Sequence, residues 1–248
     1  MDAMRAFDKA SLPDVVLQPS AGNAFENTVE QLARAIRLGV LANGEQLPPE
    51  RELAERLGVA RNTLRDAIAA LRESGLVTTK RGRGGGTWVT YAAQFPAAST
   101  AAPKGAFVRS GAALADAIDF RRVVEPGAAW LTATRSLARD QRVWLTDSLR
   151  EVDEAPDDAE RRVADSRLHL AIAALSGSPM LIDAVTRSQA ALHEMLTAIP
   201  VLRRNIEHSD QQHHDIVDAI LRGDAERART VMEEHCDATS ALLRGLIG

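Results

Sequence analysis

The chain has 248 residues, enough for one large domain or two ordinary ones. Its 45% hydrophobic and 26% charged residues are typical of water-soluble globular proteins, and scarce aromatics (4%) beside abundant alanine, leucine and arginine favour helices. The sequence has no bilayer-spanning apolar run and no secretory signal, and its single cysteine excludes an internal disulfide, so we expect a cytoplasmic protein.

The net charge of −4 is unevenly distributed along the chain. Residues 46–83 carry eight basic and five acidic side chains, a local charge of +3, so the remainder carries −7. A basic segment within an acidic chain is typical of a DNA contact surface whose charge is outweighed by other domains. A solvated helix face is the alternative interpretation of such a count.

Apolar residues at helical spacing predict three helices in the first part of the chain: one from Phe25 to the break at Asn43-Gly44, one that opens at Pro48-Pro49 and stops at Gly58, and one from about Ala60 to Ser74. Two short β-prone runs, residues 76–80 and 87–90, follow and flank a tip of glycine and arginine. Three helices followed by a hairpin predict a winged helix-turn-helix over residues 25–90.

The third predicted helix carries the side chains expected to read DNA. In a helix-turn-helix the second helix lies in the major groove, and its N-terminal residues reach the base edges. Arg61 and Arg65 lie one turn apart on one face, and arginine can bind guanine O6 and N7 with two hydrogen bonds. Asn62 and Thr63 can bond bases or phosphates. We assign backbone contacts to Arg51 and to the wing tip, Arg81-Gly82-Arg83.

The stretch LPPERELAERLGVARNTLRDAIAALRESGLV, with the following RGRGGGTWV, resembles the winged-helix domain of the GntR family of bacterial repressors over about residues 25–90. The resemblance implies a sequence-specific, DNA-binding transcription regulator. It places six residues at DNA-contacting positions: Arg51, Arg61, Asn62, Thr63, Arg65 and Gly82. Ala60 departs from the family, in which serine is frequent, so a phosphate bond or a helix cap would be lost there.

The rest of the chain predicts a separate helical domain. Residues 91–111 are rich in alanine, proline, serine and glycine, which is typical of a linker. Residues 1–24 show no sustained period, so we expect a flexible arm there. From 112 to 248 the pattern is helical throughout, with breaks that divide it into about six helices. We therefore expect a mainly α protein, in which an antiparallel helical bundle follows the winged helix-turn-helix.

Two features of the helical part carry chemistry. Asp165 and His169 are four residues apart and project from one face of one helix. His213 and His214 precede an apolar run, and only one of them can face the interior because adjacent helical residues point about 100° apart. The apolar stripe is too wide to decide between them. A core histidine and a helix-surface Asp–His pair are the alternatives.

The segments FRRVVEPGAAWLTA, DSRLHLAIAALSGSP and HHDIVDAILRGDAERARTVMEEH resemble the FCD domain, the helical effector domain of the FadR-type branch of the GntR family. The resemblance aligns His213, not His214, with the family motif. It implies a divalent metal ion held by four residues: Asp165, His169, His213 and His235. Three imidazoles and one carboxylate suit zinc, which we place first, and also nickel, manganese or iron.

The same resemblance places Arg121 in an effector pocket, where its guanidinium would pair with a carboxylate. A surface salt bridge with Glu125, one turn away, is the alternative. We expect a homodimeric repressor that binds inverted-repeat operator DNA and releases it when a small organic acid binds to the metal and Arg121. No nucleophile motif or separate general base is evident, so we do not expect an enzyme.

Three rival functions remain open at this stage. The metal ion could itself be the signal, a metal-bound water could hydrolyse a substrate, or the chain could bind DNA without sequence preference. A metal sensor predicts that metal alone changes DNA affinity, and an enzyme predicts turnover of a candidate ligand. A nonspecific DNA-binding protein predicts salt-dependent binding that is indifferent to sequence.

Overall fold

The structure is a computed structural model, and it describes residues 13, 16, 17, 19, 24–80, 82, 85–91, 111–197, 199 and 203–247. The described residues divide into two compact units, one within residues 10–93 and the other within residues 94–248. Most of the predicted arm and linker lies outside the described residues. The predicted mainly α class is confirmed, because most described residues are helical. No described helix is both long and apolar enough to cross a lipid bilayer.

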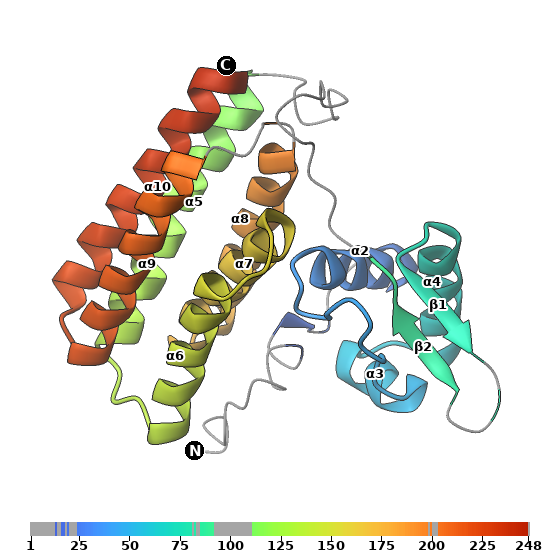
Figure 1. Ribbon diagram of the computed structural model, residues 1–248. Coiled ribbons are helices and arrows are strands. Elements are labelled where there is room, and N and C mark those ends of the chain that lie inside the picture. Colours follow the sequence, from blue (N-terminus) through green and yellow to red (C-terminus); the bar gives the residue numbers. More distant parts are fainter. Residues whose placement is uncertain are drawn as a thin grey trace. The chain divides into compact units, whose positions relative to one another are not determined.

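Among its described residues, the first unit is a winged helix-turn-helix (Figure 1) made of α2 (Ala24–Arg37), α3 (Glu50–Leu57), α4 (Arg61–Glu73), β1 (Val77–Lys80) and β2 (Gly86–Val89). The two strands pair antiparallel, with Val77 opposite Val89 and Lys80 opposite Gly86. Helices α2 and α3 both pack against α4. The apolar stripe of α4 is buried as its spacing predicted, with Leu64, Ile68 and Leu71 in the core.

Helix α2 is shorter than the sequence predicted. It ends at Arg37 and not at the Asn43-Gly44 break, because Gly39 turns the chain with a φ of 68°, a conformation that favours glycine. Leu38, Val40 and Leu41 remain buried in this turn. Their burial explains why the apolar pattern suggested a longer helix.

The turn between α3 and α4 has the chemistry that the sequence predicted. Gly58 ends α3 with a φ of 65°, and its amide donates to the carbonyl groups of Ala54 and Glu55. Ala60 is the N-cap of α4 and offers no side-chain cap, as expected from its departure from serine. The first residues of α4 after this turn, Arg61 and Asn62, are exposed to solvent.

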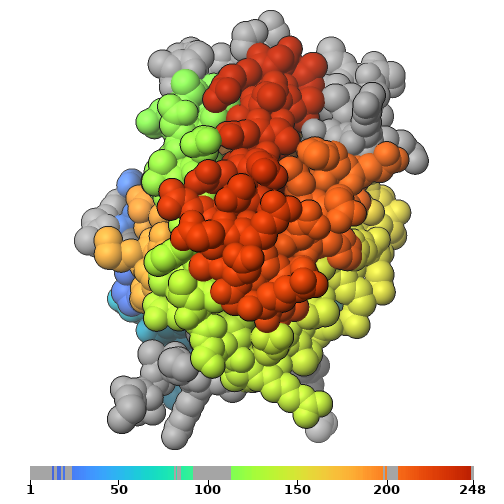
Figure 2. Space-filling view, turned by 90° about the vertical axis from the view of Figure 1, so that its left-hand side faces the viewer, coloured from blue at the N-terminus to red at the C-terminus, as the bar shows by residue number. Residues whose placement is uncertain are grey.

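The second unit is helical throughout its described residues, with α5 (Gly111–Ala133), α6 (Arg139–Asp153), α7 (Asp158–Leu175), α8 (Pro179–Thr197), α9 (Arg203–Arg222) and α10 (Ala225–Ile247). Helix α10 packs against both α5 and α9, and these helices share the face seen in Figure 2. Helix α7 packs against α6, α8 and α5. Pro126 lies inside α5 and removes one backbone N–H donor from it.

A glycine variant in the α3–α4 turn, Gly58→Ala, tests its packing, and Gly44→Ala, before α3, is the control. Gly44 and Gly58 both have positive φ, but a Cβ at Gly44 meets open space, whereas one at Gly58 lies 3.0 Å from Cβ of Pro19. We expect Gly44→Ala to lower the free energy of unfolding by about 1–2 kcal/mol through backbone strain, and Gly58→Ala to lower it further. Denaturant unfolding measures both losses, and equal losses would contradict the packing at Gly58.

Candidate nucleic-acid interface and candidate metal centre

The first candidate site is the N-terminal end of α4. Arg61, Asn62 and Arg65 are exposed there, and Thr63 is half-buried. Arg51 is exposed in the first turn of α3. The structure therefore leaves these side chains on the outside of the helix-turn-helix.

The predicted wing contacts are only partly described. Gly82 is exposed and has a φ of 97°, a conformation that L side chains rarely adopt. Arg81 and Arg83, the predicted contacts on either side of it, lie outside the described residues.

Arg65 forms an ion pair that the sequence analysis missed. Its Nε donates to Oε2 of Glu50 on α3 at 2.7 Å, and this bond raises the pKa of the guanidinium. Because the bond uses Nε, the terminal nitrogens can still make the two parallel hydrogen bonds that guanine accepts.

The second candidate site is a cluster of one carboxylate and three imidazoles inside the helical unit. Asp165 and His169 come from α7, His213 from α9 and His235 from α10, and their ligand atoms all lie within 4.8 Å of one another. The three histidines are 2–3% exposed. Opposite ligands of a metal with bonds of about 2.0–2.2 Å lie about 4.0–4.4 Å apart, so the cluster is close to the size of a metal site.

The polar atoms of this cluster are not satisfied by one another. Nε2 of His213 lies 3.1 Å from Oδ1 of Asp165, yet neither ring nitrogen of His213 makes a hydrogen bond. Neither ring nitrogen of His169 makes a hydrogen bond either, although its Nδ1 lies 2.8 Å from a carboxylate oxygen of Glu125. Buried nitrogens without partners cost free energy, and a cation among them would remove that cost. The donor set therefore fits a divalent metal ion.

Glu125 on α5 contacts the cluster from outside and was not predicted as a site residue. Its Oε2 lies 2.8 Å from Nδ1 of His169 and accepts a hydrogen bond from Nε of Arg121 at 3.2 Å. Its Oε1 accepts from the hydroxyl of Ser188 and the amide of Gln189, each at 2.9 Å. A carboxylate at Nδ1 leaves Nε2 of His169 for the cluster, as is usual behind metal-binding histidines.

His235 has a similar outer contact. Its Nδ1 lies 3.3 Å from Oε1 of Gln212, which is itself buried. Gln212 directly precedes His213, and no motif or spacing in the sequence marked it as a site residue.

Burial and neighbouring charges set the ionisation of the site. Burial alone would raise the pKa of Glu125, but Arg121 and His169 outweigh it and lower the pKa to about 2. Burial would also raise the pKa of Asp165, yet the adjacent imidazoles lower it. Burial lowers the pKa of His235 well below its ordinary value, and the positive groups around it add to this shift. His235 is therefore neutral, the state that binds a metal.

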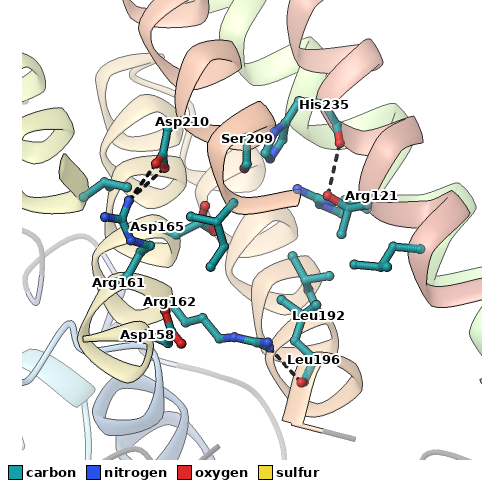
Figure 3. Close-up of a pocket in the computed structure, with 14 residues that line it drawn as sticks. Arg121, Asp158, Arg161, Arg162, Asp165, Leu192, Leu196, Ser209, Asp210 and His235 are labelled. Atoms are coloured by element: carbon teal, nitrogen blue, oxygen red, sulfur yellow. Dashed lines mark hydrogen bonds and ion pairs between the residues drawn. The ribbon is translucent and has the colours of Figure 1, made fainter. Parts of the chain in front are cut away.

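A pocket of about 90 Å³ lies beside the cluster and is lined by Asp165, His235 and Arg121 (Figure 3). Since a cavity of about 10–15 Å³ can hold one water molecule, the pocket has room for several waters or a small ligand. Arg161 also lines it and pairs with Asp210 through one nitrogen, at 2.9 Å from each carboxylate oxygen.

Arg121 is buried in this pocket wall. It is 3% exposed and Glu125 is 1% exposed, so the alternative of a surface salt bridge between them is wrong. The terminal nitrogens of Arg121, Nη1 and Nη2, are buried and have no hydrogen-bond partner. They are donors that a bound anion could use.

The two adjacent histidines point to different environments. His213 belongs to the buried cluster, whereas the side chain of His214 is 50% exposed and lies 3.1 Å from Asp153. Cys236, next to His235, is buried, and burial raises the pKa of its thiol to about 12. The thiol therefore stays protonated at neutral pH.

Comparison with known proteins matches both units to families. The model "Bacterial regulatory proteins, gntR family" matches residues 25–86, and the model "FCD domain" matches residues 116–238. The solved structure of Escherichia coli McbR/YncC has the same fold, with a TM-score of 0.55 and 17% identity over 91% of this chain and 99% of that one.

Two curated relatives agree with these matches. "Putative HTH-type transcriptional regulator RmpR" of Mycobacterium gastri is 34% identical over 84% of this chain and 75% of its own length. "Putative L-lactate dehydrogenase operon regulatory protein" of Escherichia coli K12 is 31% identical over 79% of this chain and 76% of its own length. The chain belongs to the GntR family of DNA-binding transcription regulators and carries a C-terminal FCD domain. These relatives are regulators of transcription and not enzymes.

The depressed pKa of Glu125 predicts how acid affects stability. Its folded-state pKa of about 2 lies below the ordinary value of 4.5, so the stabilisation is present above 4.5 and is lost as the pH falls toward 2. Glu125→Gln cannot ionise and lacks this contribution. We expect the difference in unfolding free energy between the metal-free wild type and this variant to shrink over that range. A difference that is constant with pH would contradict the shift.

Proposed function

We propose that this protein is a homodimeric repressor whose operator affinity changes when a small organic acid binds at a metal site in the FCD domain. The observation that carries the proposal is the shared pocket. Two unpartnered guanidinium nitrogens of Arg121 border the same cavity as Asp165 and His235 of the candidate metal cluster. A carboxylate could bind a metal ion through one oxygen and accept hydrogen bonds from Arg121 through the other.

The metal ion in this proposal is held by Asp165, His169, His213 and His235. Three imidazoles and a carboxylate suit zinc first, with nickel, manganese and iron as alternatives. Such an ion supplies positive charge and an open coordination position for an anionic ligand. The size of the pocket supports a small metabolite over a long-chain one.

The charge around the pocket also supports an anionic ligand. Three arginines and three aspartates line it, namely Arg121, Arg161, Arg162, Asp158, Asp165 and Asp210. These charges cancel, and Glu125 behind the wall adds −1, so a divalent cation brings the site to +1. One carboxylate would neutralise it. One relative is described as the regulator of an L-lactate dehydrogenase operon, which supports testing hydroxy acids first.

For DNA binding, we propose that Arg61, Asn62, Thr63 and Arg65 face the major groove while Arg51, Arg81 and Gly82 contact the backbone. A homodimer would present two such helices to inverted half-sites, because protein and operator share a two-fold axis. The effector changes operator occupancy if it binds one arrangement of the dimer more tightly, by a coupling free energy of about 1–3 kcal/mol.

Arg65 tests base reading. Arg72 is a matched control because it is exposed in the last turn of the same helix. We expect Arg65→Ala to cost about 1–3 kcal/mol of binding to an operator selected from random DNA, with little loss on unselected DNA and little effect of Arg72→Ala. Fluorescence anisotropy at fixed salt measures all three. An equal loss on unselected DNA would make Arg65 a phosphate contact.

The adjacent histidines test the metal site, because they differ by one position and only His213 faces the cluster. We expect His213→Ala to lose zinc during dialysis while His214→Ala retains it, as measured by elemental analysis. Loss in His214→Ala alone would overturn the assignment. Retention in both variants would overturn the ligand set.

A ligand panel then tests the effector. The zinc-loaded protein is unfolded thermally with mono-, di- and hydroxycarboxylates, with and without a chelator. A true ligand at 100 times its Kd adds about 2.7 kcal/mol, and we expect this gain to vanish with the chelator and in Arg121→Met. If zinc alone changes operator affinity and no acid acts, the metal ion itself is the signal and the organic-acid proposal fails.

A further inference from the structure

We propose that Glu125 is a positioning residue that serves both halves of this site, because one carboxylate oxygen orients His169 toward the metal cluster and Arg121 toward the pocket. The inference rests on the proposed function of the site. It adds a residue that neither binds the metal nor lines the pocket, and it makes the two binding events depend on one side chain.

The sharing of a single oxygen is the first observation. Oε2 of Glu125 lies 2.8 Å from Nδ1 of His169 and 3.2 Å from Nε of Arg121. His169 is on α7 and Arg121 is on α5. Any displacement of this oxygen therefore changes the position of a candidate metal ligand and of a candidate effector ligand together.

The second observation is that the carboxylate cannot turn freely. Its other oxygen accepts hydrogen bonds from Ser188 and Gln189, both on α8, and Glu125 is 1% exposed. A carboxylate offers about four lone-pair sites, and these four contacts use them. Glu125 is thus fixed to three helices at once.

The third observation concerns the atoms that Glu125 leaves unused. An arginine that serves only as a structural partner commonly bonds a carboxylate with two nitrogens in parallel. Arg121 bonds Glu125 through Nε alone, and its two terminal nitrogens have no partner. Nδ1 of His169 makes an ion-pair contact with Glu125 at 2.8 Å, without a hydrogen bond, and its Nε2 has no hydrogen-bond partner. In both groups one nitrogen contacts Glu125, and the remaining nitrogens have no hydrogen-bond partner in the protein.

If Glu125 positions His169, removing its charge should weaken zinc binding. Outer partners of metal-binding histidines typically change metal affinity 10–100-fold when removed. We expect Glu125→Gln to weaken zinc binding by that factor in the full-length protein, measured by competition with a chromophoric chelator. Binding of acetate, the simplest carboxylate, to the zinc-loaded protein should weaken as well. Ser188→Ala is the matched control, because it removes one contact to Oε1 and leaves both contacts to Oε2.

The double variant Arg121→Met/Glu125→Gln separates positioning from charge. If Glu125 only cancels the charge of Arg121, removing both restores zinc affinity to the wild-type value, and the proposal is overturned. If Glu125 positions His169, the double variant still binds zinc weakly. Nitrogen NMR of the metal-free protein gives a second readout, in which His169 carries its proton on Nδ1 in the wild type and loses this preference in Glu125→Gln.

The remaining outcomes are also decisive. Should Glu125→Gln fail to fold by circular dichroism, Glu125→Asp replaces it, because the shorter side chain keeps the charge and cannot reach both partners. Unchanged zinc and acetate affinities in a folded variant would overturn the positioning role alone. A wild-type protein that binds no zinc would instead overturn the proposed function.

Discussion

The helical unit depends on one constraint, which is that it buries several ionisable side chains in its interior. Arg121 and Glu125 are nearly inaccessible, and three histidines lie beside them. A buried charge without a partner costs several kcal/mol, so each of these groups must be satisfied by its neighbours or by a ligand. Glu125 is fully satisfied by the protein, whereas the ring nitrogens of His169 and His213 and the terminal nitrogens of Arg121 are not. The groups around the site therefore have their hydrogen bonds within the protein, whereas several groups inside it lack a partner.

Much of the fold could be predicted because it follows local rules. The buried stripe of α4, the stop at Gly58 and the helical character of residues beyond 111 follow from spacing and from glycine. The end of α2 could not be predicted, since the turn after it is as apolar as a helix. The spacing of Asp165 and His169 put them on one face, but periodicity could not choose between His213 and His214. That choice needed the family resemblance, and the structure brings His213 to the cluster.

Glu125 shows where sequence reasoning ends. A glutamate one turn after an arginine usually marks an exposed ion pair, and nothing in α5 distinguishes a buried pair from an exposed one. Its partners Ser188 and Gln189 stand more than sixty positions away along the chain. Only the packing of α5 against α7 and α8 brings these groups together. Contacts between distant helices carry no local signature, which is why the outer residues of the site were missed.

The proline in α5 has a mechanical consequence. Pro126 cannot donate to the carbonyl of Arg122, so the helix lacks a backbone hydrogen bond in the turn that carries Arg121 and Glu125. Sharp bends in helices occur mostly at proline, so this turn is the expected place for α5 to bend. Helix α10 packs against α5, so a bend at this turn would change the angle at which the two helices meet.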